Sequence, residues 1–231
     1  MAKITFDAIA VNNPCYKAAR KMPKGKPEGI VLHSTGANNP NLKRYVNKPD
    51  ICGENPYKNY FDNPTIQGCP HIVIGKDKAG KVRAAKLLPY DICCWGCGAG
   101  ERGSYNYSPA YIQIEVCEDA LTDEKYFSEA FTLAAQVCKR LMDTHGFPVD
   151  NIVSHKEAHA LGYASNHGDP ENWFSRFGKD MDWFRRLTEN NGVDVERYVV
   201  TGTKTVTGAD ELRITKNQLS AQGFEVTAKK I

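Results

Sequence analysis

Short, largely apolar runs that end in a polar residue recur along the first 190 residues of the chain. Three of these runs lead directly into a titratable side chain, at His33, Glu115 and His155. Runs of three to six residues bounded by turn-forming residues are typical of buried β-strands. The pattern therefore predicts several strands whose last residues, or the residues just after them, carry the chemistry.

One further pair of strands and one long helix follow from the same pattern. Residues 71–75 and 81–85, with a turn between them, predict a hairpin. Thr122 is the expected N-cap of a helix that Gly146 ends. Apolar residues recur at helical spacing between these two points and predict the core face of the helix, at Phe127, Phe131, Ala134, Cys138 and Leu141.

The rest of the main region predicts one more strand, one more helix and two irregular segments. The strand is expected at 151–154 and the helix at 180–188, whereas residues 1–28 predict an irregular arm and residues 36–68 a long loop with about one helical turn. The order of strands and helices predicts an α/β fold of the mixed α+β kind, with a central mixed β-sheet flanked by helices.

The C-terminal region has a separate pattern. After a linker at 189–192, residues 197–201 and 224–228 predict strands on either side of a helix at 209–221. A β-α-β piece of this size is too small to be stable alone. We therefore expect a main domain over residues 1–190 and a small module over residues 191–231. The module would dock on the main domain, pair with a second copy in a homo-oligomer, or be part of a larger unit.

Composition narrows the possible partners and compartment. The net charge of +3 gives no reason to expect nucleic acid, and no apolar stretch is long enough to insert in a membrane. The N-terminus lacks the pattern of a signal peptide, which predicts synthesis in the cytoplasm. Eight cysteines without a complete metal-binding spacing predict reduced thiols rather than a disulfide framework.

Two histidines and a carboxylate at strand ends or tight turns predict an open zinc site. We expect His33, His155 and Asp169 as the ligands, and a zinc with three protein ligands keeps a fourth position for water. Glu115, on a separate strand, is the spare carboxylate that such a site needs to carry a proton. His159, one helical turn beyond His155, is the alternative second ligand.

The motifs around these residues resemble those of zinc-dependent N-acetylmuramoyl-L-alanine amidases, of the type-2 amidase and peptidoglycan-recognition-protein superfamily. The matching stretches are a strand ending in His33, a Pro-His-apolar strand with an Asp-Gly turn, a strand ending in Glu115, a strand followed by His155, and an Asp-Pro turn at Asp169. The similarity covers about residues 25 to 188. Residues 154–173 also resemble endolysins and autolysins of clostridial type.

The resemblance implies roles for individual residues. His33, His155 and Asp169 would hold Zn²⁺, and Glu115 would be catalytic. His167 stands where some relatives have a catalytic lysine and would stabilise the oxyanion. His71, Trp95 and Asn106 would contact the substrate, although core packing explains His71 and Trp95 nearly as well.

The function that the resemblance implies is hydrolysis of the amide between N-acetylmuramic acid and L-alanine in peptidoglycan. Without a signal peptide, an endolysin or autolysin that reaches the cell wall after release is one route, and a cytoplasmic amidase that recycles muropeptides is another. The same motifs are compatible with a non-catalytic peptidoglycan-binding protein, a zinc endopeptidase that cuts within the stem peptide, or a zinc-stabilised structural module.

Overall fold

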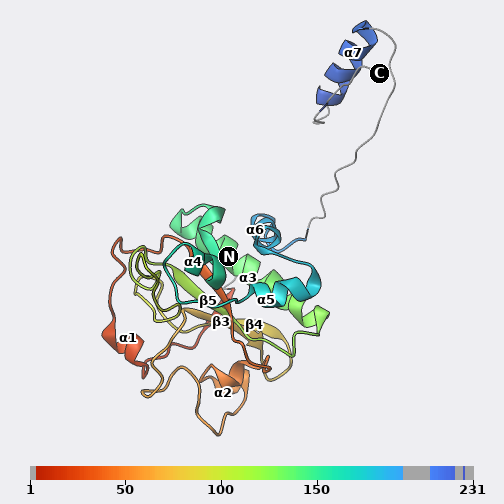
Figure 1. Cartoon of the computed structure of the whole chain (residues 1–231). Coiled ribbons are helices and arrows are strands. Elements are labelled where there is room, and N and C mark those ends of the chain that lie inside the picture. Colours follow the sequence, from red (N-terminus) through yellow and green to blue (C-terminus); the bar gives the residue numbers. More distant parts are fainter. Residues whose placement is uncertain (1–3, 195–208, 222–225, 227–231) are drawn as a thin grey trace. The chain divides into compact units, whose positions relative to one another are not determined.

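The computed structural model describes residues 4–194, 209–221 and 226. The described part of the main region forms a six-stranded mixed sheet in the order β1-β4-β3-β5-β2-β6 (Figure 1). The strands are β1 (Thr5–Asp7), β2 (Ile30–Ser34), β3 (Ile72–Lys76), β4 (Val82–Lys86), β5 (Ile112–Val116) and β6 (Ile152–Ser154). The predicted fold class, a mixed sheet flanked by helices, is confirmed.

The pairing of three parallel strands explains why their polar ends meet. Strand β2 lies between β5 and β6 and runs parallel to both, and the register places His33 opposite Glu115. The carboxyl ends of parallel strands lie at one edge of a sheet. Strand β3 runs parallel to β5 and forms the predicted antiparallel hairpin with β4.

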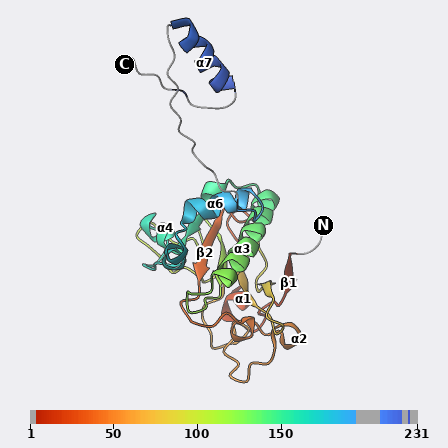
Figure 2. The same ribbon diagram turned by 90° about the vertical axis from the view of Figure 1, so that its right-hand side faces the viewer.

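The helices within the described residues are mostly short. They are α1 (Pro14–Ala18), α2 (Pro49–Cys52), α3 (Glu124–His145), α4 (His155–Ala160), α5 (Glu171–Phe174), α6 (Met181–Glu189) and α7 (Ala209–Ala221). Single 3₁₀ turns occur at Leu42–Arg44, Val149–Asn151 and Ser175–Phe177. Figure 1 shows α3, α5 and α6 on one side of the sheet, away from α1 and α2. The long helix α3 packs against α6, strand β4 and strand β3 (Figure 2).

The structure confirms the predicted long helix and its core face but corrects its N-cap residue. The N-cap is Asp123, whose side chain accepts a hydrogen bond from the backbone N–H of Tyr126, and not Thr122. A carboxylate at this position also interacts favourably with the helix dipole. Gly146 ends the helix in the left-handed region, with φ of 73°. All five predicted core residues of α3 are buried.

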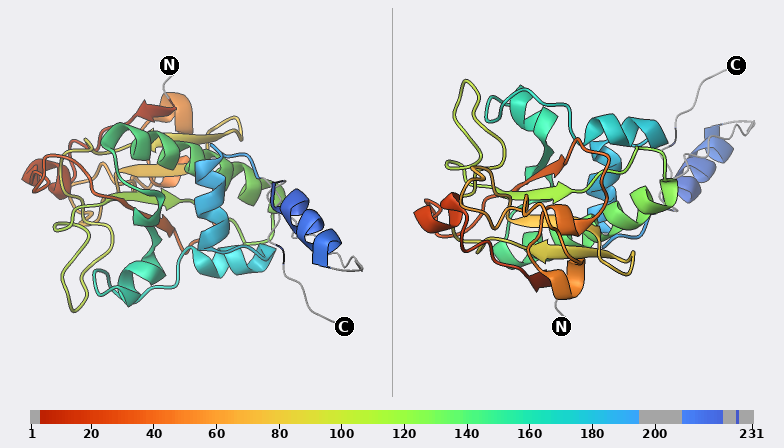
Figure 3. Two further views of the ribbon diagram at one scale, coloured as in Figure 1. Left: turned by 90° about the horizontal axis from the view of Figure 1, so that it is seen from above. Right: turned by 90° about the horizontal axis from the view of Figure 1, so that it is seen from below.

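The sheet has two faces of different character. Ile112, Ile114 and Val116 of β5 pack into the aromatic cluster beneath α3, α5 and α6. Seen from above, α6 runs across α3, with which it is in contact (Figure 3). Because side chains alternate along a strand, Gln113 and Glu115 point to the opposite face, which long loops cover. The chemistry-bearing residues therefore lie on the loop-covered face.

The N-terminal arm is more ordered than the pattern predicts. Residues 1–28 contain strand β1, which adds to the edge of the sheet by pairing with β4, and helix α1. Asn13 caps α1 by accepting a hydrogen bond from the backbone N–H of Cys15. A three-residue edge strand and a five-residue helix are too short to produce a periodic signal. The loop at 36–68, expected to hold about one helical turn, holds two short helical segments, at Leu42–Arg44 and Pro49–Cys52.

The C-terminal region forms a second compact unit, over residues 196–231. Its helix α7 spans the residues that the sequence predicts, Ala209–Ala221. Of the two predicted strands that flank this helix, residues 197–201 lie outside the described residues, and so do all residues of 224–228 except 226. No helix in the described part of the chain is long and apolar enough to cross a membrane. All eight cysteines are free and buried.

Candidate metal centre

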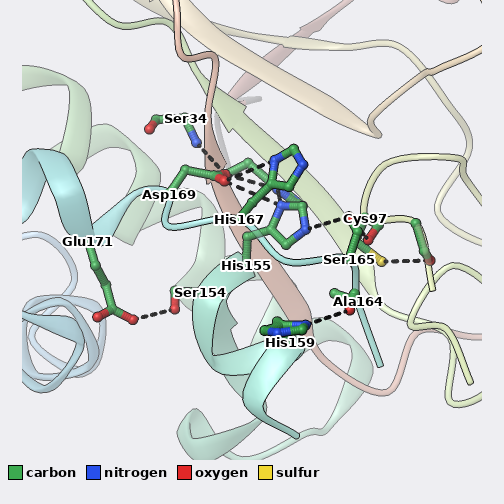
Figure 4. Close-up of polar contacts among 12 residues, drawn as sticks. Ser34, Cys97, Ser154, His155, His159, Ala164, Ser165, His167, Asp169 and Glu171 are labelled. Carbon is green, nitrogen blue, oxygen red and sulfur yellow. Dashed lines mark hydrogen bonds and ion pairs between the residues drawn. The ribbon is translucent and has the colours of Figure 1, made fainter. Parts of the chain in front are cut away.

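Three side chains from separate elements converge at the edge of the sheet where β2 and β6 end. His33 lies near the end of β2, His155 begins helix α4 directly after β6, and Asp169 lies in the turn before α5. Nδ1 of His33 is 3.0 Å from Nδ1 of His155 and 3.3 Å from Oδ2 of Asp169. Nδ1 of His155 is 3.4 Å from Oδ1 of Asp169. Figure 4 shows His155 and Asp169 side by side.

The spacing of these atoms fits a tetrahedral metal ion. Bonds of about 2.0–2.1 Å to zinc imply ligand atoms about 3.3–3.4 Å apart, close to the three distances observed. The donor set, two imidazole nitrogens and one carboxylate, also suits zinc. Among the described residues, one group of histidine, cysteine, aspartate or glutamate side chains could hold a metal ion. It consists of His33, His155 and Asp169, whose ligand atoms all lie within 4.8 Å of one another.

Hydrogen bonds hold each of the three side chains in place. Nε2 of His33 lies 2.5 Å from Oε1 of Gln113, and Nε2 of His155 lies 3.3 Å from Oγ of Ser165. The backbone N–H of Ser34 donates to Oδ2 of Asp169 at 3.2 Å. With their Nε2 atoms engaged in this way, both histidines turn Nδ1 toward the carboxylate.

The electrostatics of the cluster keep Asp169 ionised. Burial works to raise the pKa of Asp169, but hydrogen bonds from His155 and His33 hold this pKa well below its usual value. Burial lowers the pKa of His155. Burial acts in the same direction on His33, but the hydrogen bond to Asp169 and the charge of Glu115 raise the pKa of His33 overall. The site thus presents an anion between two imidazoles, an arrangement that attracts a cation.

Glu115 lies beside the cluster, opposite His33 in the strand register. Its Oε2 atom is buried and has no hydrogen-bond partner among the described residues. Burial raises the pKa of Glu115 to about 7, against the lowering influence of His33. A buried carboxyl that titrates near neutral pH is suited to accept and return a proton.

Two further histidines differ in their relation to the cluster. His167 is exposed, its ring stacks on that of His155 with centroids 4.6 Å apart, and its Nδ1 lies 3.8 Å from Oδ1 of Asp169. His159 lies outside the cluster, where its Nδ1 donates to the carbonyl of Ala164 at 3.1 Å (Figure 4). The structure therefore brings His155, and not His159, to the other two side chains.

The three residues expected to contact substrate lie mostly inside the protein. His71 has no exposed surface, and both of its ring nitrogens are satisfied inside the protein: Nε2 donates to the carbonyl of Ile92 and Nδ1 accepts from the backbone N–H of Gln113. Asn106 is 5% exposed and accepts hydrogen bonds from the backbone N–H groups of residues 96 and 97. Trp95 is partly buried. The structure gives His71 and Asn106 positions that connect strands and loops, not positions on an open surface.

Gln113, Ser165 and Cys97 surround the two histidines, and sequence reasoning did not single them out. Gln113 did leave a signal, because it is a fully buried amide between Ile112 and Ile114 on a central strand. A buried polar side chain needs a hydrogen-bond partner, and here one partner is His33. Ser165 and Cys97 lie in loops, where sequence spacing says nothing about which strands they approach.

Comparison with known proteins places this arrangement in a family. The family profile described as N-acetylmuramoyl-L-alanine amidase matches residues 23–172, which include all three clustered side chains. Protein Ami of Listeria monocytogenes is 25% identical over 172 residues, which make up 71% of this chain and 16% of that protein. The chain thus spans about a sixth of the length of this curated relative.

Solved structures share the fold. A mutant endolysin from Bacillus subtilis superposes with a TM-score of 0.53 at 23% identity, over 81% of this chain and 99% of that one. The Staphylococcus aureus hydrolase AmiA, solved in complex with its ligand, gives a TM-score of 0.57 at 18% identity, over 83% of this chain and 84% of that one. With the family profile covering well over half of its length, this chain belongs to the N-acetylmuramoyl-L-alanine amidase family.

Proposed function

We propose that this chain is a zinc-dependent amidase that hydrolyses the bond between the lactyl group of N-acetylmuramic acid and L-alanine in peptidoglycan. The observation that carries the proposal is the convergence of Nδ1 of His33, Nδ1 of His155 and a carboxylate oxygen of Asp169 at tetrahedral spacing. Family membership supports the substrate class. In this proposal the three side chains hold Zn²⁺.

Each nearby side chain has a defined task in this reaction. When bound, zinc lowers the pKa of a water molecule to about 7 and polarises the carbonyl of the substrate. Glu115 takes up a proton at its unpartnered Oε2 and later returns it to the leaving amine. A carboxyl whose pKa is near 7 can do both at neutral pH.

His167 completes the proposed site from the exposed side. Its ring stacks on His155, and more than half of its side chain faces solvent. A protonated imidazole at this position would stabilise the negative charge that develops on the carbonyl oxygen of the substrate.

We also propose the wider setting of the enzyme. Residues 1–190 would be the catalytic domain, and residues 191–231 an appended module for wall binding or self-association. The protein would act as an endolysin or autolysin on the cell wall after its release from the cytoplasm. The resemblance of residues 154–173 to clostridial enzymes of both kinds supports this setting.

Digestion of purified peptidoglycan tests the proposed reaction. Wild type, Asp169→Ala and the control Asp150→Ala are compared, and zinc content is measured on each; Asp150 is exposed and lies outside the cluster. We expect wild type and the control to release free L-alanine amino termini without new reducing ends. Asp169→Ala should lose both this activity and the metal.

Two other results of the same digestion would contradict the proposed reaction. Binding of peptidoglycan by wild type without release of any product would favour a recognition protein. Release of amino termini other than those of L-alanine, identified by mass spectrometry of the products, would favour an endopeptidase.

A further inference from the structure

The loop segment 96–98 contacts both histidines of the cluster through one intermediate side chain each. Gln113 connects it to His33, and Ser165 connects it to His155. Cys97 takes part in both connections, through its thiol on one side and its carbonyl on the other. Both connections reach the histidine through its Nε2 atom, the ring nitrogen that does not face Asp169.

The connection to His33 starts from two backbone N–H groups, which can only donate hydrogen bonds. The backbone N–H groups of Gly96 and Cys97 donate to Oδ1 of Asn106, at 2.9 and 3.2 Å, so this atom must be the amide oxygen. The thiol of Cys97 lies 3.4 Å from the same oxygen and 3.8 Å from the carbonyl oxygens of Gly98 and Tyr163, and it donates its proton to this group of oxygens. The sulfur is then free to act only as an acceptor toward other groups.

The amide of Gln113 is oriented by that sulfur. Its Nε2 donates to Sγ of Cys97 at 3.6 Å, so its Oε1 faces Nε2 of His33 at 2.5 Å. An amide oxygen can only accept a hydrogen bond, so Nε2 of His33 must carry a proton. In the neutral ring, Nδ1 is then left with a lone pair that faces His155 and Asp169. Gln113 is fully buried, so a water molecule cannot take over this contact.

The connection to His155 orients its partner in the same way but involves fewer hydrogen bonds. The hydroxyl of Ser165 donates to the carbonyl of Cys97 at 3.1 Å, and its oxygen lies 3.3 Å from Nε2 of His155. With its own proton committed, this oxygen accepts from Nε2 and leaves Nδ1 of His155 unprotonated. Ser165 is only partly buried, so water can replace it in part.

We infer that Gln113 and Ser165 are positioning residues, oriented by Cys97, that select the metal-binding tautomer of both histidines. The inference rests on the proposed function only in taking the ion to be zinc. It assigns Asn106 a place at the start of the connection to His33, in place of a substrate contact. Groups that hold the second nitrogen of a ligand histidine contribute about 10- to 100-fold to metal affinity.

Zinc affinity measured by competition with a chromophoric chelator tests the inference. Gln113→Met removes the acceptor and should weaken the affinity by about 10- to 100-fold. Gln113→Glu keeps an oxygen toward His33 and should restore most of this loss. Ser165→Ala should have a smaller effect because water can reach its place, and the matched control Gln136→Met, on the helix-covered side, should have none.

Nuclear magnetic resonance of the metal-free protein provides a readout that requires neither metal nor activity. In the neutral ring, nitrogen shifts of His33 should show a single tautomer with the proton on Nε2 in wild type and Gln113→Glu, and a mixture in Gln113→Met. Should Gln113→Met fail to fold, Cys97→Ala leaves Gln113 in place but frees its amide to rotate, and should give the same mixture. Cys97→Ser keeps a donor and an acceptor and should retain the single tautomer.

The outcomes separate this inference from the proposed function. The inference would be overturned if the Gln113→Met variant bound zinc as tightly as wild type and kept a single His33 tautomer. Peptidoglycan cleavage by wild type would still stand. Conversely, a wild type that binds zinc but leaves peptidoglycan uncut would end the proposed function, and a weakened affinity in Gln113→Met would still support the role of Gln113.

Discussion

The helix-covered face of the central sheet and its loop-covered face differ in how their side chains are satisfied. On the helix-covered face, aromatic rings such as Phe127, Phe131 and Trp173 pack against one another and against isoleucines of the strands. On the loop-covered face, the same strands present His33 and Gln113, which hydrogen-bond to each other, and Gln113 also donates to the sulfur of Cys97 in a loop.

The helix-covered side of the strands therefore supplies stability, and the loop-covered side of the same strands supplies the chemistry. Apolar packing is non-directional and tolerates many arrangements, whereas a buried polar group needs a partner at a fixed distance and angle. The helix-covered face can therefore supply stability without specifying the site. Substitutions on either face should separate the two contributions, and the largest effect is expected at Glu115.

Replacement of Glu115 should affect chemistry without affecting the fold or the metal. Glu115→Gln removes the proton carrier but not the side chain's volume, so peptidoglycan turnover should fall by about 10²- to 10⁴-fold. Zinc content, measured on the purified variant, should remain near that of wild type, since Glu115 is not in the ligand cluster. Loss of zinc together with activity would mean that Glu115 supports the metal directly.

A cavity on the helix-covered face should lower the stability of the fold without changing zinc binding. Phe131 is fully buried against Trp173 and Phe174, with ring centroids 5.1 and 4.7 Å away. Phe131→Ala should lower the free energy of unfolding by about 3–5 kcal/mol in urea titrations. The zinc affinity of the folded fraction should be unchanged. As a control, Tyr57→Ala should cost less than about 0.5 kcal/mol, because Tyr57 is 86% exposed.

The pH dependence of stability should report polar groups of the loop-covered face. Burial lowers the pKa of His71 to about 4, so the unfolded chain takes up a proton near pH 6.5 while the folded protein does not. Stability from His71 is therefore complete above pH 6.5 and is lost as the pH falls toward 4, by about 3 kcal/mol.

The contribution of Glu115 to stability changes with pH in the opposite direction, over an overlapping pH range. Its pKa is raised to about 7 in the folded protein, so its contribution is lost as the pH rises from about 4.5 to 7. Urea unfolding of metal-free wild type, His71→Gln and Glu115→Gln between pH 4 and 8 separates the two. His71→Gln should lose the acid-side decline, and an unchanged decline would show that another group causes it.

The smallest effect should come from the glycine that lies against Gln113. A Cβ at Gly96 would lie 3.0–3.2 Å from three atoms of the Gln113 side chain, which has no free space to move into. Gly96→Ala should therefore displace Gln113 slightly and weaken zinc binding by about threefold to tenfold. Gly25→Ala, where a Cβ meets nothing within 4 Å but the φ of 65° strains an alanine, should lower stability slightly and leave zinc affinity unchanged in the same chelator competition.

The sequence by itself determined the parts of the fold that depend on periodic apolar positions. Strands β2 to β6 and helix α3 follow from runs and repeats that any buried strand or helix must have, because each must bury one face or both. The polar residues at the ends of β2, β5 and β6 also predicted a metal site at the strand ends, and the structure adds that these three strands run parallel and so end at one edge.

Only the tertiary structure decided how that edge is organised. Nothing in the spacing of Cys97, Gln113 and Ser165 indicates that one loop residue contacts both of the others. The choice of His155 over His159 likewise depended on the path of the chain between β6 and Asp169. Hydrogen bonds between residues 16 to 68 positions apart act only over about 3 Å, so the packing of the loops on the sheet had to be known before they could be found.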